Sequence, residues 1–220
     1  MFTNKDILIH DVDGGFTKFG APSFCALLVI LIIFSFRPLV AQTQKVDSLK
    51  SILEQRFGPN QQLILFELAY HFTDSDNHLA MDYLNQAAKL SYTFGDSLMI
   101  VKCGRLKSLL YRRFDQMDSS LILSRRILPI AERNKFNDEI KKILNGLALV
   151  YSYRANYDEA LSAYLSILDL FDPTKNKSEA SVILQNIGLV YFKLDDLDKA
   201  LYYFNKSLAL KDQANDQFDI

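Results

Sequence analysis

Apolar residues recur at intervals of three and four from roughly residue 61 onward, which is the spacing of one face of an α-helix. In residues 186–204, NIGLVYFKLDDLDKALYYF, two such runs flank a polar turn at Asp195 and Asp196. The pattern therefore predicts two helices joined by a short turn. Upstream, VDSLKSILEQRF at residues 46–57 has an apolar face and is followed by GPN, which predicts one more helix, packed onto the first pair.

Small residues return every 40 positions, at 80, 120, 160 and 200. The same interval relates several other columns: Ser108, Ala148 and Gly188; Tyr111, Tyr151 and Tyr191; Leu121, Leu161 and Leu201; Leu128, Leu168 and Leu208. Small side chains let two helices approach to about 8–10 Å. A helical hairpin cannot bury its apolar face alone, so neighbouring hairpins must stack.

This pattern predicts an all-α protein, an α-solenoid of about four stacked hairpins. The expected units are residues 61–95, 96–136, 137–176 and 177–212, with a capping helix and turn at 42–60 and a further, incomplete repeat beginning at 213–220. Four residues before each small residue stand side chains that are mostly of the helix-capping type: Asp76, Gln116, Asn156 and Asp196. Asn156 with Glu159 also has the spacing of a capping box.

The fourth unit contains the pattern L..IG..Y........A...F, formed by Leu184, Ile187, Gly188, Tyr191, Ala200 and Phe204. It resembles the tetratricopeptide repeat, and the third unit matches through Leu144, Leu147, Ala148, Tyr151, Ala160 and Tyr164. The 40-residue period is longer than the usual 34 and is similar to the repeats of kinesin light chains. It also lies in the range of HEAT repeats, which form α-solenoids as well.

The resemblance implies a protein or peptide ligand, held by the first helix of each hairpin. Carried over by register, the binding positions are Lys102, Arg105, Leu109, Arg112, Arg113, Lys142, Asn145, Leu149, Ser152, Tyr153, Val182, Gln185, Leu189, Phe192 and Lys193. The cations of the second unit could hold a carboxylate by charge-assisted hydrogen bonds. The alternative is a solvated helix face that keeps the solenoid soluble.

The N-terminal region has the order of a secretory signal. The apolar run FCALLVILIIFSF at residues 24–36 follows Lys18 and precedes RPLVAQ, so we expect cleavage near Ala41 and export to the periplasm or cell envelope. Permanent anchoring in the membrane by residues 24–36 is the alternative. A signal followed by 40-residue repeats also resembles the extracytoplasmic part of Bacteroidetes-type sensor histidine kinases and related regulators.

A second reading of the N-terminus concerns ILIHDVDGGF at residues 7–16, which resembles the nucleophile loop of haloacid dehalogenase-type phosphatases. There the first aspartate, here Asp11, attacks phosphorus, and the second, here Asp13, acts as acid and base. That chemistry needs a parallel sheet, a lysine and a metal carboxylate. Because an export signal and helices follow instead, we do not expect an enzyme.

The composition limits the classes of partner that the chain is expected to bind. The chain of 220 residues has 25 basic and 26 acidic residues, so no net field attracts nucleic acid. Two cysteines and three histidines, none at metal-ligand spacing, predict neither a metal site nor a cofactor, and no small-molecule substrate is evident. We therefore expect a protein-interaction scaffold. A narrower form of this hypothesis is that the chain is the sensor part of a larger signalling protein. A self-associating structural solenoid is the other alternative.

Overall fold

The computed structural model describes residues 8–10, 16–18, 45–53, 60–171 and 176–215. The chain divides into two units, Met1–Ile52 and Leu53–Ile220. In the first unit, β1 (Leu8–His10) pairs antiparallel with β2 (Phe16–Lys18), and residues 45–52 are helical. The phosphatase alternative requires a parallel sheet, whereas the strand before Asp11 pairs with an antiparallel one. Asp11, Asp13, residues 24–36 and Ala41 lie outside the described residues.

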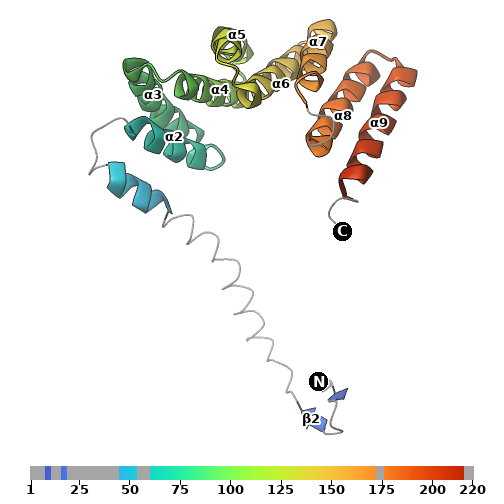
Figure 1. Ribbon diagram of the computed structural model, residues 1–220, viewed down its shortest axis with the longest axis horizontal. Coiled ribbons are helices and arrows are strands. Elements are labelled where there is room, and N and C mark those ends of the chain that lie inside the picture. Colours follow the sequence, from blue (N-terminus) through green and yellow to red (C-terminus); the bar gives the residue numbers. More distant parts are fainter. Residues whose placement is uncertain (1–7, 11–15, 19–44, 54–59, 172–175, 216–220) are drawn as a thin grey trace. The chain divides into compact units, whose positions relative to one another are not determined.

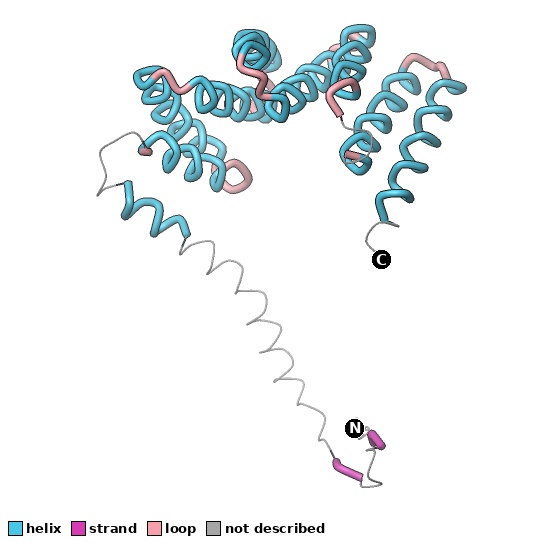
Figure 2. The backbone as a smooth tube through the Cα atoms, in the orientation of Figure 1, coloured by secondary structure: helices cyan, strands magenta, loops and turns pink. Residues whose placement is uncertain are grey.

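The second unit consists of helical hairpins, as the 40-residue pattern predicts (Figure 1). Its described helices are α2 (Gln61–Phe72), α3 (Asn77–Phe94), α4 (Ser97–Arg113), α5 (Met117–Arg133), α6 (Asn137–Tyr153), α7 (Tyr157–Leu168), α8 (Lys177–Lys193) and α9 (Leu197–Asn215). We call α2, α4, α6 and α8 the A helices, and α3, α5, α7 and α9 the B helices. Within each hairpin a short turn joins the two helices, as Figure 2 shows. The expected α-solenoid of four hairpins is confirmed.

The small residues of the repeat lie where the two helices of each hairpin meet. Ala80, Ser120, Ala160 and Ala200 are all at most 2% exposed. A Cβ atom added to Gly188 would lie 2.7 Å from two ring carbons of Phe204, so α8 and α9 approach each other closely at this point. Three clusters of buried side chains then run along the array, each formed by neighbouring helices. The spacing of small residues therefore encodes helix packing.

The turns depend on residues with left-handed backbone. Asp115, Ala155 and Asp195, again 40 positions apart, have φ of 57°, 58° and 60° in the turns from A helix to B helix. This conformation lets the backbone N–H of the next residue bond to a carbonyl of the A helix, as in Gln116 N to Tyr111 O at 2.8 Å. None of these residues is glycine, so the surrounding packing imposes the conformation.

The predicted helix caps are only partly correct. Asp76 accepts hydrogen bonds from the backbone N–H groups of His78 and Leu79, and Asp196 accepts one from Lys199. Neither Gln116 nor Asn156 makes a side-chain capping bond, so the capping box expected at Asn156 is wrong. None of the described helices is long and apolar enough to cross a membrane.

The third hairpin has a shorter B helix than the others. α7 has 12 residues, whereas α3 has 18 and α5 has 17. After Leu168 the chain continues in turns, with backbone bonds from Leu170 N to Ile167 O and from Phe171 N to Leu168 O. α4 packs directly against α6, but α6 and α8 have at most marginal backbone contact.

Candidate functional site

Exposed apolar side chains occur on several helices, among them the A helices of the third and fourth hairpins. On these two A helices they are Leu149 and Tyr153 on α6 and Val182, Leu189 and Phe192 on α8, each between 42% and 67% exposed. We call these five side chains the helix-A face. Each of them stays exposed to solvent in the folded chain, and exposed apolar groups of this kind mark interaction sites. Gln185 and Lys193, two further predicted positions, are exposed on the same helix, α8.

Two of the predicted cations are bound to one buried carboxylate. Arg105 Nε donates to Glu139 Oε2 at 2.6 Å, and Lys142 Nζ donates to the other oxygen at 3.3 Å. Arg105 belongs to α4 and Glu139 to α6, so this pair joins successive A helices. Lys102 is half-buried and lines a neighbouring cavity of about 540 Å3. Part of the predicted basic surface is therefore neutralised inside the array.

Arg113 also has a structural contact that the sequence did not reveal. Its guanidinium donates to the backbone carbonyl of Thr73, to Asp74 Oδ1 at 2.8 Å and to Asn77 Oδ1 at 3.2 Å. All three acceptors lie in or next to the turn between α2 and α3. Arg113 thus links the first hairpin to the second, and its charge is already paired.

Arg112 is different, because no described residue accepts a hydrogen bond from its guanidinium. It is half-buried and lines a cavity of about 160 Å3 together with Arg105, Asn145 and Gly146. Burial, followed by the nearby charges of Arg113 and Arg105, lowers the pKa of Arg112. A desolvated guanidinium without an acceptor is available to an anionic or carbonyl group of a ligand.

Asn145 supplies the complementary polar group. Its Oδ1 is buried and has no hydrogen-bond donor among the described residues. It lines both the cavity at Arg112 and a second cavity farther along α6. Buried acceptors are almost always satisfied, so an unpaired one at a cavity wall is suited to a ligand's N–H group.

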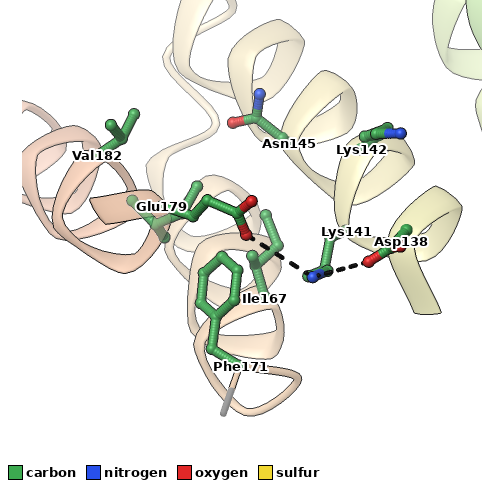
Figure 3. Close-up of a pocket in the computed structure, with 9 residues that line it drawn as sticks. Asp138, Lys141, Lys142, Asn145, Ile167, Phe171, Glu179 and Val182 are labelled. Carbon is green, nitrogen blue, oxygen red and sulfur yellow. Dashed lines mark ion pairs between the residues drawn. The ribbon is translucent and has the colours of Figure 1, made fainter. Parts of the chain in front are cut away.

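This second cavity lies between α6, α7 and α8 and has a volume of about 400 Å3 (Figure 3). Its apolar wall is formed by Ile167, Phe171, Val182 and Ile183. On its rim, Lys141 Nζ bonds Asp138 at 3.0 Å and reaches Glu179 at 3.8 Å, as the dashed lines show.

The hydrogen bond from Lys141 is the largest cause that lowers the pKa of Asp138. Sequence reasoning missed this cavity.

The remaining predicted residues are structural or solvent-facing. Leu109 is half-buried against the first core cluster, and Ser152 is half-buried near the end of α6. His78 lies against Phe114, with ring centroids 5.0 Å apart. Burial raises the pKa of the Cys103 thiol to about 12, which makes it unreactive. Within the described ranges no group of three or more His, Cys, Asp and Glu residues could hold a metal ion.

The hairpins, the small-residue columns and the A-to-B turns define an α-solenoid. Residues 139–213 match the family model described as tetratricopeptide repeat. No curated protein sequence matches the chain significantly.

Solved structures show the same fold at low identity. BtubC (BKLC) from P. vanneervenii is 16% identical, with a TM-score of 0.71 over 87% of this chain and 82% of that chain. The apo form of RapI is 18% identical, with a TM-score of 0.73 over 84% of this chain and 69% of that one. NprR, solved in complex with its cognate peptide NprX, is 20% identical, with a TM-score of 0.61 over 79% and 52%. At these identities the likeness shows the fold alone.

Proposed function

We propose that this chain is a protein-interaction scaffold that binds a peptide or protein segment across the A helices α6 and α8. The observation that carries the proposal is the helix-A face, five apolar side chains exposed on two successive A helices. Its burial by a partner would be favourable by about 25 cal/mol for each Å2 of apolar surface removed from water. The structure of NprR with NprX supports the proposal, because a similar fold there holds a peptide.

Polar groups beside this face determine what kind of segment fits. The unpaired guanidinium of Arg112 suits an acceptor, and the unpaired Oδ1 of Asn145 suits a donor. A peptide backbone presents both kinds of group at every residue, and an acidic side chain or chain end adds a charge-assisted bond. The proposed partner is therefore a peptide segment with apolar side chains and an acceptor group for Arg112.

The test begins with a random-peptide display selection on the full chain. Selected peptides carrying a fluorescent label are then titrated by anisotropy against the wild type and against Phe192→Asp. We expect the substitution to weaken binding at least tenfold, because it places a charge where an apolar contact forms. The matched control is Ile122→Asp, which changes an apolar side chain that is 70% exposed on the B helix α5.

Equal binding by the wild type and both variants would refute the assignment of the A helices. So would a selection that yields no binding peptide.

We further propose that the chain is exported and works as the sensor part of a larger signalling protein, as its resemblance to Bacteroidetes-type sensors suggests. Residues 24–36 and Ala41 carry this proposal on sequence alone. Mass spectrometry of the native protein tests it. A mature N-terminus at Gln42 supports cleavage and export, and retention of residues 1–41 in a soluble cell extract contradicts them.

A further inference from the structure

Two departures from the 40-residue pattern meet at the cavity between α6, α7 and α8. Phe171 stands at the repeat position of Ala131, which is completely buried in α5. Lys141 stands at the position of Val101, which is completely buried in α4. Lys141 Nζ lies 4.9 Å from the centre of the Phe171 ring. A cavity of about 540 Å3 also lies at the corresponding place between the second and third hairpins, but there both of these positions are buried in the core instead of lining the cavity.

Phe171 lines this cavity from beyond the end of α7. α5 continues to Arg133, so Ala131 lies in its last turn, whereas α7 ends at Leu168 and Phe171 follows in the connecting segment. In Figure 3 the Phe171 ring lies between the end of α7 and Glu179 of α8. The cavity volume of about 400 Å3 is within the range of about 300–1,000 Å3 typical of ligand pockets.

The charges at the rim are balanced, so the cavity does not demand a charged occupant. Lys141 is bonded to Asp138 and also lies near Glu179, and Lys142 is bonded to Glu139. The inner wall is apolar, because Ile167 and Ile183 are buried core side chains and Val182 stands at the exposed edge. An uncharged apolar group gains the most by entering such a site.

Asn145 adds a requirement for a donor. Its amide extends from α6 toward α8, where Val182 lies (Figure 3), and its Oδ1 is buried without a partner. An apolar group that covered Asn145 without supplying an N–H would leave this buried acceptor unsatisfied and would therefore bind more weakly. A peptide residue carries both an apolar side chain and an adjacent backbone N–H.

From these observations we infer that the cavity is a specificity pocket for one leucine- or phenylalanine-sized side chain of a bound peptide. The backbone N–H beside that side chain donates to Asn145 Oδ1. The inference rests on the proposed function, since it names the residue type that the peptide-binding surface selects.

Three small amides test the pocket without knowledge of the natural partner. N-acetyl-leucinamide, N-acetyl-phenylalaninamide and N-acetyl-glycinamide are titrated into the full chain with isotope-labelled Val and Ile methyl groups. The methyl signals of Val182 and Ile183 should shift and saturate with the first two compounds, and with glycinamide they should not. Equal shifts with all three compounds, or no shift with any, would overturn the inference.

Variants separate the pocket from the surface around it. Val182→Trp should fill the mouth of the cavity and abolish saturable binding of leucinamide. Leu201→Trp, at a side chain that is 61% exposed on α9 and lies outside both the cavity lining and the helix-A face, is the matched control and should bind as the wild type does. Asn145→Ala should weaken binding by about fivefold, as expected for one hydrogen bond. Unchanged binding by Val182→Trp would contradict the pocket.

The peptides selected by display distinguish this inference from the proposed function. If they bind through Phe192 but tolerate Val182→Trp and show no preference for leucine or phenylalanine at any position, the surface stands and the pocket is wrong. If no peptide is selected but leucinamide saturates the Val182 and Ile183 signals, the cavity accepts the side chain, but the peptide-scaffold proposal, and with it the pocket's role in peptide selection, is wrong.

Discussion

Replacing Gly188 by alanine should destabilise the fourth hairpin. In the interior of a helix, alanine is about 1 kcal/mol more favourable than glycine. At Gly188, however, the new Cβ would lie 2.7 Å from Phe204 Cδ1 and Cε1 and 3.2 Å from Cζ. Relief requires the ring or one of the helices to move, and overpacking of this kind costs about 1–3 kcal/mol. We expect a net change in the free energy of unfolding between about zero and 2 kcal/mol, in the destabilising direction.

Gly146→Ala is the matched control because it makes the same substitution in α6. Its Cβ would lie 2.9 Å from Arg112 Nη1, the end of a long side chain that can turn aside. The helix-propensity gain is the same at both sites, so the difference between the two variants isolates the packing cost. Gly146→Ala should therefore be more stable than Gly188→Ala by about 1–3 kcal/mol.

Urea unfolding followed by circular dichroism measures both variants. Because stacked repeats unfold partly as separate units, amide hydrogen exchange of α8 and α9 should show where stability is lost. In a Phe204→Leu background the penalty at Gly188 should shrink, and a double-mutant cycle gives the coupling energy. If Gly188→Ala proves as stable as Gly146→Ala, the close approach of α8 to Phe204 does not explain the glycine.

Two further predictions concern the hydrogen-bonded guanidinium of Arg113 and the buried thiol of Cys103. Arg113→Ala should lower the free energy of unfolding by about 1.5–3 kcal/mol, because it removes a charged donor from the Thr73 carbonyl. Asp74→Ala, at a side chain that is 85% exposed, should change the free energy of unfolding by less than about 1 kcal/mol. Urea unfolding compares the two variants, and equal losses of stability would contradict the reasoning.

Cys103 should resist thiol reagents at pH 8 until the array unfolds. Burial raises the pKa of Cys103 from 9.0 to about 12, so the thiol ionises at lower pH in the unfolded chain than in the folded one, and the stability should fall as the pH rises above about 9. Labelling of the native protein at the rate of a free thiol would refute the burial of Cys103.

The sequence predicts the fold well because the signals that specify it are local and repeated. Apolar spacing identifies the helices, and the columns at Ala160 and Gly188 identify the contacts within each hairpin. The left-handed turn at Ala155 escaped prediction because alanine has no preference for that conformation. Its φ is imposed by the two helices that it joins, and this constraint is not visible in the turn sequence.

The candidate site is predicted less completely, since it depends on how successive hairpins pack. Register correctly placed Leu149, Leu189 and Phe192 among the exposed side chains of the A helices. Register could not show that Arg113 reaches back to the preceding turn, because the two residues of this pair are 39 positions apart and meet only when the hairpins pack at a particular angle. The cavity at Phe171 also required the packing of three helices. No local pattern in the sequence indicated it.

The contacts between successive hairpins differ in number and distance, so the joints of the array differ in stiffness. Between the second and third hairpins, Arg105 bonds Glu139 and Arg154 bonds Asp118, both at 2.6 Å. Between the third and fourth, Lys141 reaches Glu179 at 3.8 Å on the rim of the cavity. When joints of different stiffness are connected one after another, an applied load deforms the most compliant joint most. A side chain wedged between α6 and α8 would stiffen that joint, so occupancy at one cavity would set the bending modulus of the solenoid.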